Sequence, residues 1–140
     1  MLDPRRSDCP ISYALDLFGD RWTLLVIRDI LFKHKHRYSE FLESEEQIAT
    51  NILADRLRKL EDAGMITRTK AARNAGGVTY TLTEKGLDLA PMLIEIILWS
   101  ARHDVATAAE PEFVAAALQD REALAIAVVQ RHGEPTTSES

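Results

Sequence analysis

The sequence predicts a mainly helical fold with one small β-hairpin, an α+β arrangement, from three observations. Residues 48–64 carry apolar side chains at helical spacing and end at Gly64. Residues 65–70 and 78–82 are short β-branched and aromatic runs around a glycine-containing loop, as a hairpin requires. Thr83 then opens another run with helical spacing. A helix, a hairpin and a second helix in this order is the layout of a winged helix-turn-helix.

The first two helices are predicted from their ends. Pro10 suits the first turn of a helix, and this helix should end at Gly19. Asp20 is well placed to cap a second helix that runs over about residues 21–32.

A basic loop at residues 33–37 leads to the next elements. Ser39 is the expected N-cap of a short helix over residues 40–44. Residues 45–49 then form the turn before the long helix, where Thr50 is the expected cap.

The long helix has one apolar stripe and one polar face. At about 100° per residue, Leu53, Leu57 and Leu60 fall on the same side and should be buried. The opposite face carries Asn51, Asp55, Arg58 and Asp62. That face either meets base edges in a DNA major groove or is a solvated surface with ion pairs four residues apart.

The chain after the hairpin is also helical. Helical spacing runs from Thr83 to about His103, and Pro91 should kink or split that helix. Pro111 restarts a helical pattern of about twenty residues, which ends near His132. Its broad apolar face should either pack against the helix after the hairpin or form one wall of a small-molecule pocket.

Charge is divided unevenly along the chain. The net charge is −5, yet residues 1–103 hold 15 basic and 15 acidic side chains. Residues 104–140 therefore carry the whole acidic excess. Residues 50–73, by contrast, have a local charge of +3, which suits contact with phosphates.

Several classes of protein are disfavoured. A single cysteine, Cys9, excludes an intrachain disulfide and favours a reducing cytoplasm. No apolar run is long enough to cross a membrane. His34 and His36 lie between basic residues and make a poor metal site, and no catalytic constellation or cofactor motif is present, so an enzyme is not expected.

Several separate motifs together resemble the HxlR-type winged-helix regulators of the MarR-like superfamily. The similarity covers roughly residues 9–103 and lies in four segments: Cys9 to Asp29 (CPISYALDLFGDRWTLLVIRD), Arg37 to Phe41 (RYSEF), Leu53 to Gly64 (LADRLRKLEDAG) and Tyr80 to Gly86 (YTLTEKG).

The resemblance implies a homodimeric transcription regulator without enzymatic activity that binds a near-palindromic operator on double-stranded DNA. We expect residues 1–103 to form the DNA-binding domain with its dimerisation helices, and residues 104–140 to form a helical extension and polar tail. We expect the protein to act chiefly as a repressor. The residues expected at the dimer interface are Ile11, Leu15, Leu93, Ile94, Ile97, Leu98 and Trp99.

The same resemblance implies a set of DNA contacts from two helices and the hairpin. Ser39 would meet a phosphate, and the long helix would enter the major groove. The full set of expected DNA-binding residues is Lys35, Arg37, Ser39, Thr50, Asn51, Ala54, Asp55, Arg58, Arg68, Lys70 and Arg73.

Two kinds of signal are expected to modulate binding: a redox or electrophile signal at Cys9, or a small-molecule effector. Some members of the resembled family sense oxidants through a cysteine at the matching position, and a helix start favours thiolate. The alternative is a small, buried hydrophobic side chain. The runner-up function is a winged-helix module for protein–protein contact, which the balanced charge of residues 1–103 leaves open.

Overall fold

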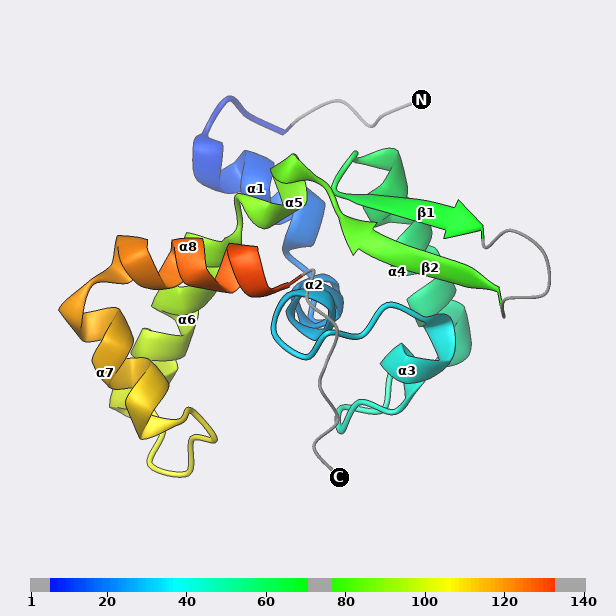
Figure 1. The fold of residues 1–140 in the computed structure, drawn as a ribbon. Helices are drawn as coiled ribbons and strands as arrows, with labels where there is room; N and C mark the ends of the chain where they lie inside the picture. The colour runs from blue at the N-terminus through cyan, green and yellow to red at the C-terminus, as the bar shows by residue number, and fades with distance from the viewer. Residues whose placement is uncertain (1–5, 71–76, 133–140) are drawn as a thin grey trace, which may run out of the picture.

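The computed structural model describes residues 6–70 and 77–132, and the ribbon in Figure 1 shows a two-stranded hairpin at one edge of a group of helices. The elements, in chain order, are α1 (Pro10–Phe18), α2 (Thr23–Leu31), α3 (Tyr38–Leu42), α4 (Thr50–Asp62), β1 (Ile66–Lys70), β2 (Val78–Leu82), α5 (Glu84–Leu87), α6 (Ala90–His103), α7 (Pro111–Gln119) and α8 (Arg121–Arg131). This is the predicted winged helix-turn-helix, with further helices at both ends.

The wing is an antiparallel pair of strands that begins shortly after the end of α4 in the chain. Gly64 adopts a φ of 75°, the left-handed conformation that ends a helix most easily when the residue is glycine. The strands pair from Ile66 with Leu82 to Lys70 with Val78. The backbone N–H of Tyr80 donates to the carbonyl of His36 (2.8 Å), which ties the loop before α3 to the wing.

The leucine stripe of α4 forms the centre of the core, as predicted. Leu53, Leu57 and Leu60 are buried together with Ile27 and Ile30 of α2. Burying a leucine side chain is worth about 1.5–3 kcal/mol, so the stripe holds α4 firmly in one rotation about its axis.

The structure corrects three predicted helix starts. α2 begins at Thr23, not residue 21, because the Asp20 carboxylate accepts hydrogen bonds from the N–H groups of both Trp22 and Thr23. Ser39 is not the N-cap of α3. That helix begins at Tyr38, in the stretch where the Glu40 carboxylate accepts the N–H groups of His36 (3.1 Å) and Arg37 (2.9 Å).

The third correction concerns α4. Thr50 is the first helical residue, and Ala49 occupies the cap position instead. Alanine has no side-chain acceptor, so this helix starts without a side-chain cap.

The helical runs after the wing are broken where a local signal competes with the periodicity. Pro91 splits its run as predicted: Thr83 caps the short α5, and α6 starts again with Pro91 in its first turn. The predicted single helix from Pro111 is wrong, because Asp120 adopts an extended conformation. Its carboxylate accepts the N–H of Ala123 (3.0 Å) and caps α8.

The C-terminal helices pack onto α6 and the winged core. Ala117 of α7 and Ala125 of α8 are buried with Ile94 of α6. The Phe113 ring meets the Phe32 ring edge to face, with centroids 5.9 Å apart. In Figure 1, α8 crosses over α6 toward the end of α2, so the apolar face of this extension is largely used within the chain.

Candidate nucleic-acid interface

The outward face of α4 presents polar side chains at the positions that the sequence predicts. Thr50, Asn51, Ala54 and Arg58 are exposed, whereas Asp55 is partly covered. The leucine stripe leaves only this face free, and a helix held in this way can enter a DNA major groove.

The wing adds two cations beside this face. Side chains alternate along a strand, so Arg68 and Lys70 lie on the same side of β1 as the buried Ile66. Both cations are exposed. Arg73, the third predicted wing residue, lies outside the described residues.

A groove of about 270 Å³ runs between α3, α4 and the wing. It is lined by Tyr38, Ala54, Leu57, Arg58, Glu61, Arg68 and Tyr80. Arg58 and Arg68 thus line one groove from two elements, an arrangement in which α4 and the wing can both meet one stretch of nucleic acid.

Tyr38 is a site residue that the sequence analysis did not single out. Its hydroxyl donates to the carbonyl of Thr50 (2.7 Å), so it fixes the start of α4 against α3. The two residues are twelve positions apart on different helices, and no local spacing rule connects them.

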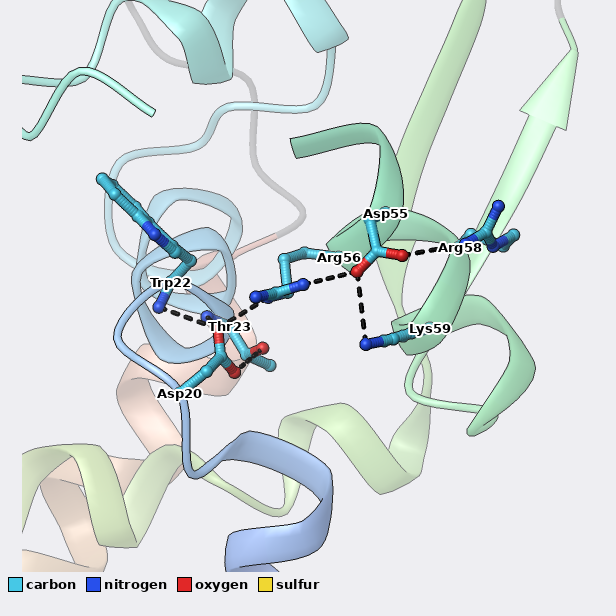
Figure 2. A network of polar contacts seen from close by, with 7 residues as sticks. All are labelled: Asp20, Trp22, Thr23, Asp55, Arg56, Arg58 and Lys59. Atoms are coloured by element: carbon cyan, nitrogen blue, oxygen red, sulfur yellow. Dashed lines mark hydrogen bonds and ion pairs between the residues drawn. The ribbon is translucent and has the colours of Figure 1, made fainter. Parts of the chain in front are cut away.

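A network of charged side chains, drawn in Figure 2, connects α4 to the start of α2. Arg56 donates to Asp20 (2.7 Å) and also to Asp55, its neighbour on α4. Asp55 in turn binds Arg58 (2.8 Å) and Lys59 (3.3 Å). The sequence analysis did not find Arg56, because its partner Asp20 is 36 positions away.

The network ends at Asp20, whose carboxylate is bound to the start of α2. Partial burial raises the pKa of its carboxyl, but hydrogen bonds from Thr23 and Arg56 outweigh that effect and bring the pKa to about 2. The carboxylate therefore stays ionised while it caps α2 and holds Arg56.

A second polar cluster fixes the loop that carries Lys35. Buried Asp29 accepts from Arg28 (2.7 Å) and from the hydroxyl of Ser44 (2.5 Å), and Lys35 donates to that same hydroxyl (3.0 Å). Arg28 also forms a two-pronged pair with Glu46 and lowers the Glu46 pKa to about 2. The ammonium of Lys35 is thus held by the fold, whereas Arg37 and Ser39 are exposed.

Cys9 lies at the N-cap of α1 and is exposed. Its backbone N–H donates to Ser7 Oγ (3.3 Å). Arg6, in the segment before α1, forms an ion pair with Asp16 of that helix (2.9 Å).

The residues predicted for the dimer interface fall into two groups. Leu93 and Ile94 are only 6% and 1% exposed, so their side chains are taken up by packing within the chain. Ile11 and Leu15 on α1, and Trp99 on α6, are more than half exposed. Ile97 and Leu98 are partly buried.

A second groove, of about 500 Å³, lies between α6 and α7. Its lining is Glu95, Leu98, Trp99, Ala101, Arg102, Val114, Leu118 and Arg121. An ion pair between Arg121 and Glu95 (2.5 Å) crosses from α8 to α6 beside it.

Two features are absent from the residues described. Within 6–70 and 77–132, no three His, Cys, Asp or Glu side chains are grouped so as to hold a metal ion. No helix among them is both long and apolar enough to span a membrane.

The fold and the polar helix face beside a basic wing define a winged helix-turn-helix protein of the DNA-binding class. A model of the HxlR-like helix-turn-helix family matches residues 17–107, and the chain belongs to this family of transcriptional regulators, which are not enzymes. The match leaves Cys9 and most of α1 before its start, and α7 and α8 after its end.

Relatives agree in class. The uncharacterized HTH-type transcriptional regulator sll1512 of Synechocystis is 37% identical over 86 residues, which cover 61% of this chain and 63% of that protein. The chain thus spans a little under two thirds of that relative's length.

Solved structures are also similar. The crystal structure of the transcription factor candidate PA1607 shares 35% identity with a TM-score of 0.66, over 76% of this chain and 72% of that one. The reduced form of the transcriptional regulator YodB from Bacillus subtilis shares 31% identity with a TM-score of 0.59, over 72% and 99%. YodB has also been solved after diamide treatment and with a bound quinone.

The capping role of Asp20 gives a testable prediction for stability. Asp20→Ala should lower the free energy of unfolding by about 1–2 kcal/mol, because two N–H groups of the α2 start lose their acceptor. Asp20→Asn keeps an acceptor and should lose less. Urea denaturation measures both.

The same site predicts a pH dependence. The folded pKa of Asp20, about 2, lies below its ordinary value of 3.8. The unfolded state therefore binds more protons between these values, and stability falls as pH is lowered through about 4 to 2. Asp20→Asn should flatten that decline and leave the part due to Glu46 and Asp55, whose pKa values are also lowered. Identical declines in both proteins would contradict the role assigned to Asp20.

Proposed function

We propose that this regulator is a homodimer that represses transcription by binding a near-palindromic operator. The groove between α4 and the wing carries this proposal, because it brings Arg58 and Arg68 from two elements to one surface. Two copies of α4 would enter successive major grooves about one helical turn apart.

Each predicted contact has a distinct task in this proposal. Asn51 and Arg58, exposed on α4, would read base edges, with Thr50, Ala54 and Asp55 beside them. Ser39, Arg37, Arg68 and Lys70 would bind phosphates, and Arg73 would extend the wing. Lys35 would act mainly through the long-range positive potential, since its ammonium is bound to Ser44.

The test is a fluorescence-anisotropy titration against the intergenic DNA that flanks the gene and a scrambled duplex, at several salt concentrations. Arg58→Ala should weaken operator binding by about 1–3 kcal/mol, because a base contact is lost. Lys70→Ala should weaken binding to both duplexes alike and reduce the salt slope by about 1.

The titrations test the phosphate contact of Lys70 and the sequence preference of the protein separately. An unchanged salt slope in Lys70→Ala would remove its phosphate contact. Equal weak binding of the wild type to both duplexes would favour the protein–protein module over a sequence-specific regulator at this DNA.

The dimer would use the exposed apolar residues of α1 and α6. Ile11, Leu15 and Trp99 are large apolar side chains that the single chain leaves uncovered. Leu93 and Ile94, buried within the chain, would support this surface from below. Ile97 and Leu98 are partly buried and would contribute the portions of their side chains that remain exposed.

A charge at this surface tests the dimer. Leu15→Glu should convert the dimer to a monomer in sedimentation velocity, because a carboxylate would be buried without a partner. Val105→Glu, in the exposed loop between α6 and α7, is the control and should stay dimeric. A Leu15→Glu protein that remains a dimer would place the interface elsewhere.

Oxidation or alkylation at Cys9 is the proposed signal, with a small-molecule effector as the other possibility. The exposed thiol and the diamide-treated and quinone-bound forms of YodB support it. Diamide would take two electrons and two protons from the Cys9 thiols of two protomers as one interchain disulfide forms. A quinone would instead form a bond between a ring carbon and the Cys9 sulfur, with the thiol proton passing to a quinone oxygen, to leave a hydroquinone thioether.

Diamide should therefore lower the affinity of the wild type for its operator by about 5–150-fold, the usual range of allosteric coupling. Cys9→Ser is the matched control and should keep its affinity, and dithiothreitol should restore the wild type. If diamide and a quinone both leave the wild-type affinity unchanged, Cys9 is no sensor and the effector hypothesis stands alone.

A further inference from the structure

The Asp55 carboxylate is the meeting point of three cations on α4. Arg58 lies one turn ahead and donates to Asp55 (2.8 Å), Lys59 approaches it at 3.3 Å, and Arg56 binds it from the side of the core. Figure 2 shows Arg58 and Lys59 both joined to this carboxylate. Two cations that would otherwise be free to contact DNA thus share one internal counter-ion.

The three side chains differ in exposure. Arg58 and Lys59 are 68% and 66% exposed, while Asp55 is 30% exposed. Ion pairs of exposed side chains are weak and break readily when a stronger partner approaches. A DNA phosphate or base edge therefore competes directly with Asp55 for both cations.

The Asp55 carboxylate is held in position by Arg56, which is itself bound to Asp20. Arg56 binds Asp55 on one side and Asp20 on the other, and Asp20 is fixed by its hydrogen bonds to the start of α2. The Asp55 carboxylate therefore stays directed at Arg58 and Lys59, and does not depend on those flexible side chains for its position.

We propose that Asp55 is a specificity-determining residue that acts through Arg58, as a positioning residue. On DNA without a matching base, it keeps Arg58 and Lys59 from neutralising phosphates and adds its own repulsion. At the operator, it holds one Arg58 N–H while the other donors of the guanidinium remain available for a base edge. The proposal rests on the DNA-binding function proposed above.

The two effects act in opposite directions on the two kinds of DNA. Phosphate contacts strengthen binding to any sequence, whereas a pre-oriented arginine strengthens binding only where a guanine accepts it. Removing the Asp55 charge should raise non-specific affinity without an equal gain at the operator.

The experiment compares Asp55→Asn with Asp62→Asn on the full chain. Asp62 is exposed on the same helix and forms no ion pair with another described residue. Both variants therefore lose one negative charge from α4. Only Asp55→Asn also releases two cations, because Arg58 and Lys59 are paired with Asp55. Anisotropy titrations would use the flanking intergenic duplex and its scrambled version at several salt concentrations.

Asp55→Asn should bind the scrambled duplex about 3–10-fold more tightly than Asp62→Asn at low salt, with a salt slope steeper by about 1 for each released cation that contacts a phosphate. Its preference for the operator should fall about tenfold, one discriminating base contact. Asp62→Asn should keep the wild-type preference. Asp55→Glu, which restores a carboxylate, should recover part of it.

Tighter binding is a gain that a misfolded variant does not produce. Equal binding of the two Asn variants to scrambled DNA, or an unchanged operator preference in Asp55→Asn, would overturn the proposal. If the wild type itself fails to distinguish the two duplexes, the proposed function fails at this DNA. The comparison of the two Asn variants on scrambled DNA still decides whether Asp55 restrains the two cations.

Discussion

Burial of the leucine stripe of α4 is the constraint on which the rest of this structure depends. Leu53, Leu57 and Leu60 pack against α2 and the first residues of the wing, where Met65 and Ile66 are also buried. A helix fixed along three successive turns has one rotation about its axis. All polar residues on the other side therefore face solvent together, and this directional separation turns an amphipathic helix into a surface that can meet DNA.

Polar anchors then set the position of that helix more finely than apolar packing does. Tyr38 holds the first turn of α4, and Arg56 holds its middle to Asp20. Hydrogen bonds and ion pairs are directional, whereas the hydrophobic effect is not. The same anchors place a negative charge among the cations, so the outward face of α4 combines attraction to DNA with restraint of that attraction. This arrangement also accounts for a DNA-binding class in a chain whose first 103 residues are electrically balanced.

The extension after residue 103 changes the surface of the regulator. α7 and α8 lie beyond the region that matches the family, yet Ala117 and Ala125 pack against α6. They cover part of the helix that the sequence analysis assigned to a dimer interface, which is why Ile94 is buried within one chain. Trp99 stays uncovered beside the groove between α6 and α7. The extension thus restricts the surface of α6 that remains for the dimer and the effector proposed above.

The sequence by itself determined which helix face is buried, where the two strands lie and where α4 ends. Spacing of leucines set the buried face of α4, Gly64 set its end, and the β-branched runs set both strands, because these depend on residues within a few positions of one another. Pro91 marked the break before α6 for the same reason. The true start of α3 depends on Glu40 reaching back to the N–H groups of His36 and Arg37, and the break at Asp120 on its capping of α8. Both are local signals: Glu40 competes with Ser39 to satisfy the start of α3, and Asp120 interrupts a run that otherwise has helical periodicity.

Only the tertiary structure decided which distant side chains meet. The pairing of Asp20 with Arg56 and the contact of Tyr38 with Thr50 join residues with no fixed spacing in the chain. Such contacts arise when packing of the apolar stripe brings two elements together, and the energy of that packing contains no information about which polar groups will face each other. Asp55 can pair with both Arg58 and Lys59 because a carboxylate on a helix reaches residues three and four positions ahead. Its direction is fixed by the contact with Arg56, which the tertiary structure holds against Asp20.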